Sequence, residues 1–285
     1  MSVRENARTL ATTNRGCEDA PAHLEKPPDP ATLIAALEDR GRTPSQARLR
    51  RRFLRFARIA PGQRVLEVGS GSGVVARDVA AIVGKGGHVV GVDSGRIVIA
   101  VARRLARRAS LDGHLEFRVA DAARLPFRPR RFDTAIAVTL LLHVDRPAAV
   151  LSEMIRVTRS GGTVGAQDQD FGTLALTHPD PALTARILDA VAKSRYAEPC
   201  SGRRLPGLFA AAGLRRVRVL ADVYQDTTLG SYTRTFLERR AEHAVRLGIT
   251  DPAGAQRWLD GFVTLARAGA FVMTLNYYGV TGVKA

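Results

Sequence analysis

Apolar positions near the start of the chain have helical spacing. Between residues 31 and 57 they recur every three or four positions, and Gly41 and Pro44 interrupt the pattern. We therefore expect N-terminal helices over 31–60. The preceding segment, 1–30, is polar, lacks periodicity and ends in a proline-rich run, which predicts a disordered tail.

From residue 61 onward, short apolar runs alternate with helical patterns. This alternation is typical of an α/β fold, in which a parallel sheet carries helices on both faces. The predicted strands are 64–68, 88–92, 115–119, 132–138 and 163–167, and the predicted helices are 74–83, 96–109 and one starting near Pro147. Together they form a predicted core over 61–170.

The second half of the chain, 171–285, continues the alternation less regularly. Its predicted elements are helices at 181–192 and 205–212, a strand at 216–223, a helical insertion at 232–268 and a last strand at 271–283. We find neither an internal repeat nor a separate apolar core in this half. The pattern therefore predicts a single domain over 31–285.

A glycine-rich turn between the first strand and the first core helix is the most specific chemical signal. Glycines stand at 69, 71 and 73, so the spacing is G-x-G-x-G. Backbone N–H groups at such a strand–turn–helix junction suit a nucleotide-like ligand. A dinucleotide fingerprint has its third glycine one position later, which disfavours an NAD-dependent reductase.

Three acidic residues follow the same arrangement. Glu67 lies just before the glycine turn, Asp93 ends the second strand and Asp121 follows the third. The carboxyl ends of parallel strands share one edge of the sheet, where open α/β proteins bind ligands. A carboxylate at the position of Asp93 suits the paired hydroxyls of a ribose.

The segment Glu67-x-Gly69-x-Gly71-x-Gly73 after a strand resembles motif I of the class I S-adenosylmethionine (SAM)-dependent methyltransferases. Leu-Pro-Phe after Asp121, Leu-Leu-His-Val after the fourth strand and Ser-Gly-Gly before the fifth resemble the small-molecule branch. That branch includes the ubiquinone/menaquinone and sterol methyltransferases. The resemblance implies a Rossmann-like, seven-stranded, mostly parallel sheet with an antiparallel last strand, here with helical N-terminal and lid elements.

The resemblance also implies SAM as cofactor, a SAM-binding core over 61–170 and substrate-side elements over 171–285. In the family, the first acid helps to hold the methionine ammonium group, the second binds the ribose, and the third, with the next N–H, binds the adenine. The SAM-binding residues that it predicts are Glu67, Gly69, Ser70, Gly71, Asp93, Ser94, Asp121 and Ala122.

The methyl acceptor leaves a weaker signal. His143 follows the fourth strand and is a candidate general base, or else it caps the following loop or packs beneath the cofactor. The polar continuation of the fifth strand predicts substrate contacts by Gln167, Asp168 and Asp170. Two carboxylates without a further Asp-Asn pair make a poor divalent-cation site, so we predict no metal.

The net charge of +16 suggests nucleic acid, but 39 of the 43 basic residues are arginine and they are scattered along the chain. Residues 139–143 also lack the Asn/Asp-Pro-Pro-aromatic motif of enzymes that methylate nucleobase amino groups. With two cysteines and no apolar run long enough to span a bilayer, we expect a cytoplasmic enzyme without a membrane span.

The function predicted from the sequence is SAM-dependent methylation of a small organic molecule at O, N or C by direct in-line transfer. Two alternatives stay open. One is a SAM-binding enzyme of secondary metabolism that does not transfer methyl, such as a cyclase or isomerase, because a fold keeps its ligand when its chemistry changes. The other is an RNA methyltransferase, which the basic charge motivates.

Overall fold

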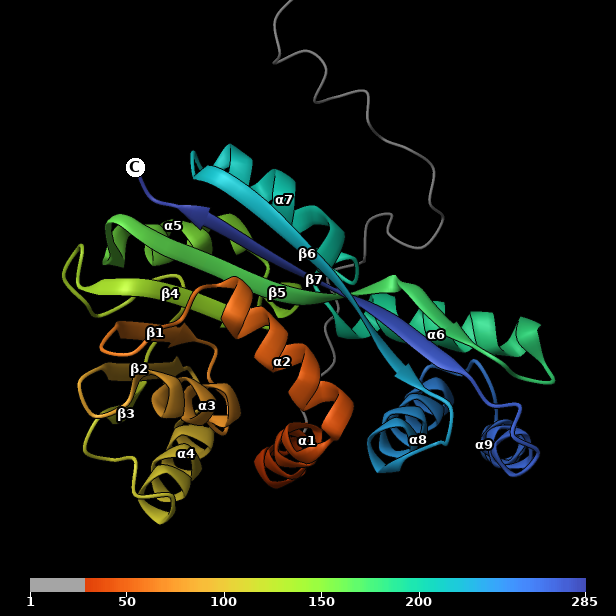
Figure 1. Cartoon of the computed structure of the whole chain (residues 1–285). Coiled ribbons are helices and arrows are strands. Elements are labelled where there is room, and N and C mark those ends of the chain that lie inside the picture. The colour runs from red at the N-terminus through yellow and green to blue at the C-terminus, as the bar shows by residue number, and fades with distance from the viewer. Residues whose placement is uncertain (1–28) are drawn as a thin grey trace, which may run out of the picture.

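A computed structural model describes residues 29–285, which contain a seven-stranded sheet of order β3-β2-β1-β4-β5-β7-β6 (Figure 1). The strands are β1 Arg64–Val68, β2 His88–Asp93, β3 Leu115–Val119, β4 Phe132–Val138, β5 Thr158–Leu176, β6 Arg215–Asp226 and β7 Met273–Val283. β1 to β5 are parallel where they pair, and β7 runs antiparallel to both β5 and β6. The predicted Rossmann-like fold is confirmed, and β1 to β4 match their predictions within one residue.

Helices cover both faces of the sheet (Figure 1). They are α1 Pro30–Arg42, α2 Pro44–Phe56, α3 Val74–Val83, α4 Arg96–Arg108, α5 Pro147–Val157, α6 Pro181–Arg195, α7 Ser201–Ala211, α8 Ser231–Arg246 and α9 Pro252–Arg267, with a 3-10 turn, η1, at Leu141–His143. Apolar side chains of α2, α3 and α4 form one buried cluster with the sheet. Those of α5 and α7 form another on the opposite face.

The N-terminal boundary begins slightly earlier than the sequence pattern indicated. The side chain of Asp29 accepts a hydrogen bond from Ala31 N at 2.9 Å, and Pro30 occupies the first turn of α1. An N-cap carboxylate followed by proline is a common start of a helix. The rest of the predicted tail lies outside the described residues.

The fifth strand is much longer than its predicted range of 163–167. It continues through the polar run Gln167–Asp170, which obscured the strand pattern, and pairs with β7 until a register shift between Asp170 and Ala175. Buried polar groups need partners, and three side chains of this run have at least one. The partners are Ser201 for Asp168, Tyr277 for Gln169 and Arg203 for Asp170.

The far halves of β5 and β7 carry an apolar cluster of their own, with α6, α8 and α9 packed around them (Figure 1). Its largest fully buried side chains include Trp258, Phe262 and Tyr277. The helical insertion predicted at 232–268 consists of two helices. A turn that contains Gly248, whose φ is +69°, separates α8 from α9. All three apolar clusters therefore pack against one continuous sheet.

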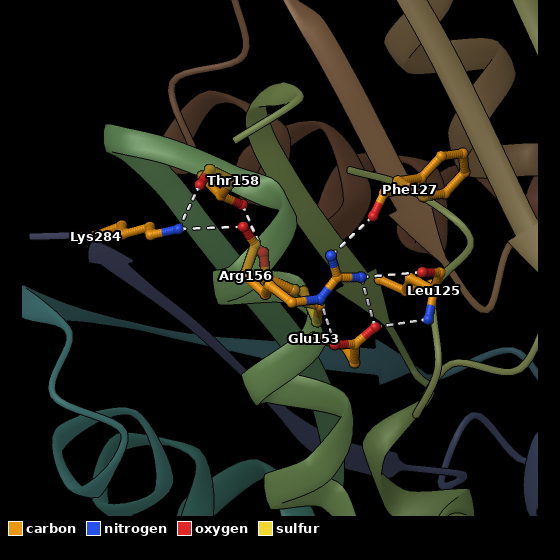
Figure 2. A network of polar contacts seen from close by, with 7 residues as sticks. Leu125, Phe127, Glu153, Arg156, Thr158 and Lys284 are labelled. Carbon is orange, nitrogen blue, oxygen red and sulfur yellow. Dashed lines mark hydrogen bonds and ion pairs between the residues drawn. The ribbon is translucent and has the colours of Figure 1, made fainter. Parts of the chain in front are cut away.

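A polar network fixes the loop that follows β3 (Figure 2). Arg156 of α5 donates to the carbonyl oxygens of Phe127 and Leu125 at 2.8 and 3.0 Å, and Glu153 accepts from Leu125 N at 2.7 Å. Lys284 donates to the carbonyl oxygen of Arg156 at 3.2 Å. The Leu-Pro-Phe segment is thereby tied to α5 and to the end of β7.

Candidate functional site

A pocket lies over the glycine turn, at the carboxyl ends of β1, β2 and β4 and beside the middle of β5. Its empty volume is about 940 Å³, part of which is open to solvent, and we call it the first pocket. The residues that line it include Leu33, Leu37, Arg40, Gln46, Glu67, Gly69, Ser70, Gly71, Asp93, Thr139, His143 and Gln167. Six of the predicted cofactor or catalytic positions, together with Gln167, are therefore assembled in one place.

The glycine turn is held by the neighbouring strand. Gly69 N and Ser70 N both donate to the carbonyl oxygen of Val92, at 2.8 and 2.9 Å. Gly71 has a φ of +51°, and a Cβ there would lie 2.8 Å from Leu37 of α1. Glycine at this position thus lets the turn adopt a left-handed conformation directly beneath α1.

Helix α1 is tied to the turn by ionic and hydrogen-bonding contacts. Glu38 accepts a hydrogen bond from Ser72 Oγ at 2.6 Å and forms an ion pair with Arg77 at 2.9 Å. This helix lines the first pocket with Leu33, Leu37 and Arg40. The sequence revealed Leu33 and Leu37 only as one face of a helix, and that face covers the pocket.

Three buried polar atoms in the first pocket have no hydrogen-bond partner among the described residues. They are Glu67 Oε2, Ser70 Oγ and Gln167 Nε2. Burial raises the pKa of Glu67 well above its usual value, because its charged form is desolvated. Unpartnered buried polar groups are rare in folded proteins, so their gathering in one pocket marks sites for the polar groups of a ligand.

Asp93 links the end of β2 to the glycine turn. Its two carboxylate oxygens accept hydrogen bonds from Gly71 N and Gly95 N, each at 2.9 Å. The side chain also lines the first pocket. A carboxylate has about four acceptor positions, so two remain for ligand hydroxyls.

The remaining predicted cofactor residues lie beside the first pocket rather than in its lining. Ser94 and Asp121 are exposed, and Ala122 is half-buried. Asp121 accepts a hydrogen bond from Ala123 N at 2.8 Å. Its neighbour Ala120 donates to the carbonyl oxygen of Asp93 at 3.0 Å, which brings this loop next to the end of β2. The roles of these three residues stay predictions.

A second pocket, with an empty volume of about 860 Å³ and also partly open, adjoins the first. It lies between α1, α6 and α8, and Gln169 of β5 also lines it. The two pockets share four lining residues, which are Leu33, Leu37, Arg40 and His143. A molecule in either pocket therefore approaches the other across Arg40 and His143.

His143 ends η1 at the junction of the pockets. The residue is exposed because it lines both pockets. Protein atoms nevertheless surround much of its imidazole ring. This desolvation, followed by the charges of Arg195 and Arg40, lowers the pKa of His143 to about 4. The imidazole is consequently neutral at physiological pH.

Arg40 is a site residue that the sequence analysis missed. It comes from α1 and donates to Thr139 Oγ1 at 3.1 Å and to Gln46 Oε1 at 3.3 Å. Its guanidinium carbon also lies 5.8 Å from the centre of the Tyr277 ring. One turn along the helix from Leu37, it extends the pocket-facing stripe, but only docking of α1 reveals this.

Matches to known proteins agree with this geometry. A family model described as a methyltransferase domain matches residues 59–200. A 37.1 kDa protein in transposon Tn4556 of Streptomyces fradiae is 30% identical over 226 residues, covering 77% of this chain and 62% of that protein. The ubiquinone/menaquinone biosynthesis C-methyltransferase of Ectopseudomonas mendocina is 30% identical over 184 residues, covering 62% of this chain and 69% of the enzyme.

The chain belongs to the class I SAM-dependent methyltransferase family. The C-methyltransferase of Rhizobium leguminosarum is 33% identical, and there the chain spans only 49% of the relative's length. Among solved structures, a SAM-dependent methyltransferase from Aquifex aeolicus has a TM-score of 0.51 at 16% identity, covering 88% of this chain and 99% of that one. The 4+2 cyclase SpnF has a TM-score of 0.54 at 24% identity, covering 84% and 81%. These structures share the fold.

SAM is the cofactor of this methyltransferase family, and the residues of the first pocket fit it. The unpartnered oxygen of Glu67 suits an ammonium group, and the free acceptor positions of Asp93 suit ribose hydroxyls. The glycine turn allows close approach of the ligand to the backbone. Within residues 29–285, none of the helices combines the length and apolarity needed to cross a membrane.

The carboxylates of the polar run lie on the opposite side of β5 from the lining of the two pockets. Substrate contact by Asp168 and Asp170 stays a prediction. Side chains alternate along a strand, so Gln167 and Gln169 line the pockets while Asp168 and Asp170 turn toward α7. Asp168 accepts from Ser201 Oγ at 2.6 Å and from Leu142 N at 3.1 Å. It thereby supports η1, which carries His143.

We predict that Asp168 makes stability depend on pH. Burial raises its pKa from 3.8 to about 7, so between these pH values the folded state keeps a proton that the unfolded state has released. Its contribution to stability is therefore complete below pH 4 and disappears as the pH rises through 7. Relative to Asp168→Asn, we expect the wild type to lose up to about 4 kcal/mol of unfolding free energy across this window.

Urea unfolding of both proteins at pH 4.5 and 7.5 measures this difference. Because the comparison is with Asp168→Asn, titration of other groups, including His143, cancels. Asp112→Asn removes an exposed carboxylate and controls for the loss of one negative charge. Parallel stability curves for the wild type and Asp168→Asn would show that Asp168 does not titrate in this range.

Proposed function

We propose that this methyltransferase transfers a methyl group from SAM to a small organic molecule held in the second pocket. The observation that carries the proposal is the junction of the two pockets at Arg40 and His143. A cofactor in the first pocket and an acceptor in the second would meet there. Helices α1, α6 and α8 surround this junction and limit the access of water.

We propose that the first pocket holds SAM through residues of three strands. Glu67 binds the methionine ammonium group, Asp93 binds the ribose, and Gly69, Ser70 and Gly71 provide the close backbone surface. Two loops beside the pocket add further contacts. Asp121 and Ala122 bind the adenine, and Ser94 lies next to the ribose contact made by Asp93. The unpartnered atoms of Glu67 and Ser70 support this arrangement.

When bound, SAM would supply the methyl group. An O, N or C atom of the acceptor would form a bond to the methyl carbon, and the SAM sulfur would keep the electron pair of the bond that breaks. The residues of this chain align the acceptor and remove its proton. His143 is neutral at physiological pH and lies at the junction, so it is placed to accept that proton. Arg40 donates a hydrogen bond to Thr139, which lines the first pocket together with His143.

We expect His143→Gln to lower kcat about a hundredfold while leaving the Kd for SAM within twofold of the wild-type value, because general-base catalysis typically contributes this much. Single-turnover transfer and calorimetric titration of SAM measure the two quantities separately. His88→Gln, at a half-buried surface position on β2, is the matched control. An unchanged kcat with the true acceptor would make His143 a packing residue.

The proposal is tested by incubating the pure protein with methyl-labelled SAM and a cell extract separated into small-molecule, RNA and protein fractions. Label in the small-molecule fraction is the expected result. Label in RNA would favour the nucleic-acid alternative that the basic charge motivates. SAM binding without label in any fraction would favour a SAM-binding enzyme that does not transfer methyl.

A further inference from the structure

The second pocket is lined by several basic side chains. Four arginines line it, and the described residues contribute one carboxylate, that of Asp39. The arginines are Arg40, Arg195, Arg239 and Arg240. Arg40 donates to neutral oxygens, and Arg239 donates to the carbonyl oxygen of Thr32 at 3.3 Å. These contacts of Arg40 and Arg239 are with uncharged oxygens.

Arg240 is the most deeply placed of these cations. Its side chain belongs to α8 and is only 5% exposed. Nη1 donates to the carbonyl oxygen of Phe236 at 3.2 Å, and the side chain also interacts with the hydroxyl of Tyr196. Nη2 is buried without a well-aligned acceptor among the described residues. None of the described carboxylates forms an ion pair with it.

The aromatic rings around Arg240 compensate its charge only in part. Its guanidinium carbon lies 3.3 Å from the centre of the Phe236 ring and 5.2 Å from that of Phe171. Cation–π contacts of this kind offset only part of the free energy that burying an unpaired ion costs. Burial accordingly lowers the pKa of Arg240.

The walls of the second pocket are flat and apolar. Tyr196, Tyr232 and Phe236 line it, and Tyr196 stacks on Phe171 with ring centres 4.5 Å apart. The rings of Tyr196 and His143 lie 5.3 Å apart, so the aromatic wall extends to the junction with the first pocket. Such walls suit a planar or aromatic body.

We propose that the second pocket binds an organic anion, a carboxylate or phosphate on a flat apolar body, and that Arg240 binds its anionic group. The inference rests on the proposed function, since it takes this anion as the methyl acceptor. Arg240 thus determines specificity: it supplies a bidentate, fixed positive charge at the inner end, while the body reaches toward His143.

The test uses defined probes rather than the unidentified acceptor. Benzoate, phenyl phosphate and the neutral benzamide are titrated by calorimetry into the full chain saturated with S-adenosylhomocysteine. We expect at least one of the two anions to bind the wild type at least tenfold more tightly than benzamide. The tighter of the two anions identifies the acidic group as carboxylate or phosphate.

Arg240→Gln should weaken binding of the preferred anion at least tenfold and leave benzamide binding within twofold. Arg234→Gln is the matched control, because Arg234 lies on the same helix, is exposed and does not line the pocket. Arg240→Met is a second variant in case the glutamine variant does not fold. Equal affinity of the wild type for benzoate, phenyl phosphate and benzamide would overturn the proposal.

Thermal unfolding without any probe separates binding from a purely structural role. Replacing a buried, uncompensated charge by an apolar side chain of similar length is neutral or stabilising, so Arg240→Met should have a Tm equal to or above that of the wild type. A lowered Tm together with unchanged anion affinity would make Arg240 a structural residue. Neither readout needs methyl transfer, so the inference can fail while the labelled-SAM experiment succeeds, and the reverse.

Discussion

Asp93→Ala is expected to weaken SAM binding by at least about a hundredfold, because it removes two hydrogen bonds to a charged acceptor that are each worth about 1.5–3 kcal/mol. The same carboxylate accepts the N–H groups of Gly71 and Gly95, so its loss also loosens the turn beneath the ligand. Calorimetric titration of SAM measures the effect. An affinity equal to that of the wild type would remove the cofactor assignment.

Two further substitutions separate ligand contact from support of the turn. Asp93→Asn keeps one oxygen for a backbone N–H group and should lower the Tm less than Asp93→Ala does, while still losing most of the affinity for SAM. Asp121→Ala removes the exposed carboxylate beside the pocket and should have a smaller effect than Asp93→Ala. If Asp121→Ala has the larger effect, the adenine contact rather than the ribose contact dominates binding.

Gly73→Ala is expected to destabilise the fold by about 2–5 kcal/mol, the sum of the left-handed backbone penalty and overpacking. Gly73 has a φ of +83°, and an added Cβ would lie 2.5 Å from Cζ of the buried Phe117 on β3. The third glycine of the motif therefore serves the packing of α3 against the sheet, and it does not line the first pocket. Urea unfolding measures the loss.

Gly213→Ala provides the matched control for the backbone penalty. Gly213 has a φ of +74° at the end of α7, and nothing lies within 4 Å of its added Cβ. We expect it to lose about 1–2 kcal/mol, the cost of the left-handed conformation alone. Phe117→Leu in the Gly73→Ala background should recover part of the difference, and equal losses at both glycines would show that the Phe117 ring yields freely.

The core of the fold was predictable because its signals are local. Alternation of strand and helix patterns located β1 to β4 within one residue. Glu67, Asp93 and Asp121 each lie near the carboxyl end of a predicted strand, which predicts that they share one edge of the sheet. The spacing of the glycines distinguished a methyltransferase turn from a dinucleotide turn. Each of these inferences depends on residues within a few positions of one another, and periodicity reports such relations directly.

The polar run on β5 shows where local signals fail. The predicted strand ends at residue 167 and its polar continuation predicts substrate contact, yet these residues form a buried strand. Tyr277 on β7 and Ser201 and Arg203 on α7 bind three of its side chains. Only this pairing decides that Gln167 and Gln169 face the pockets while Asp168 and Asp170 turn away. A one-position choice of register exchanges the two faces of a strand, and no local pattern reveals it when both faces are polar.

The sequence by itself determined the family, the SAM-type turn and the positions of the central strands along the chain, because these depend on backbone conformation and short-range periodicity. Only the tertiary structure decided which residues form the second pocket. Arg40 comes from α1 and Arg240 from α8, two hundred positions apart. Their approach depends on the docking of helices onto the extended ends of β5 and β7, which is a property of long-range packing.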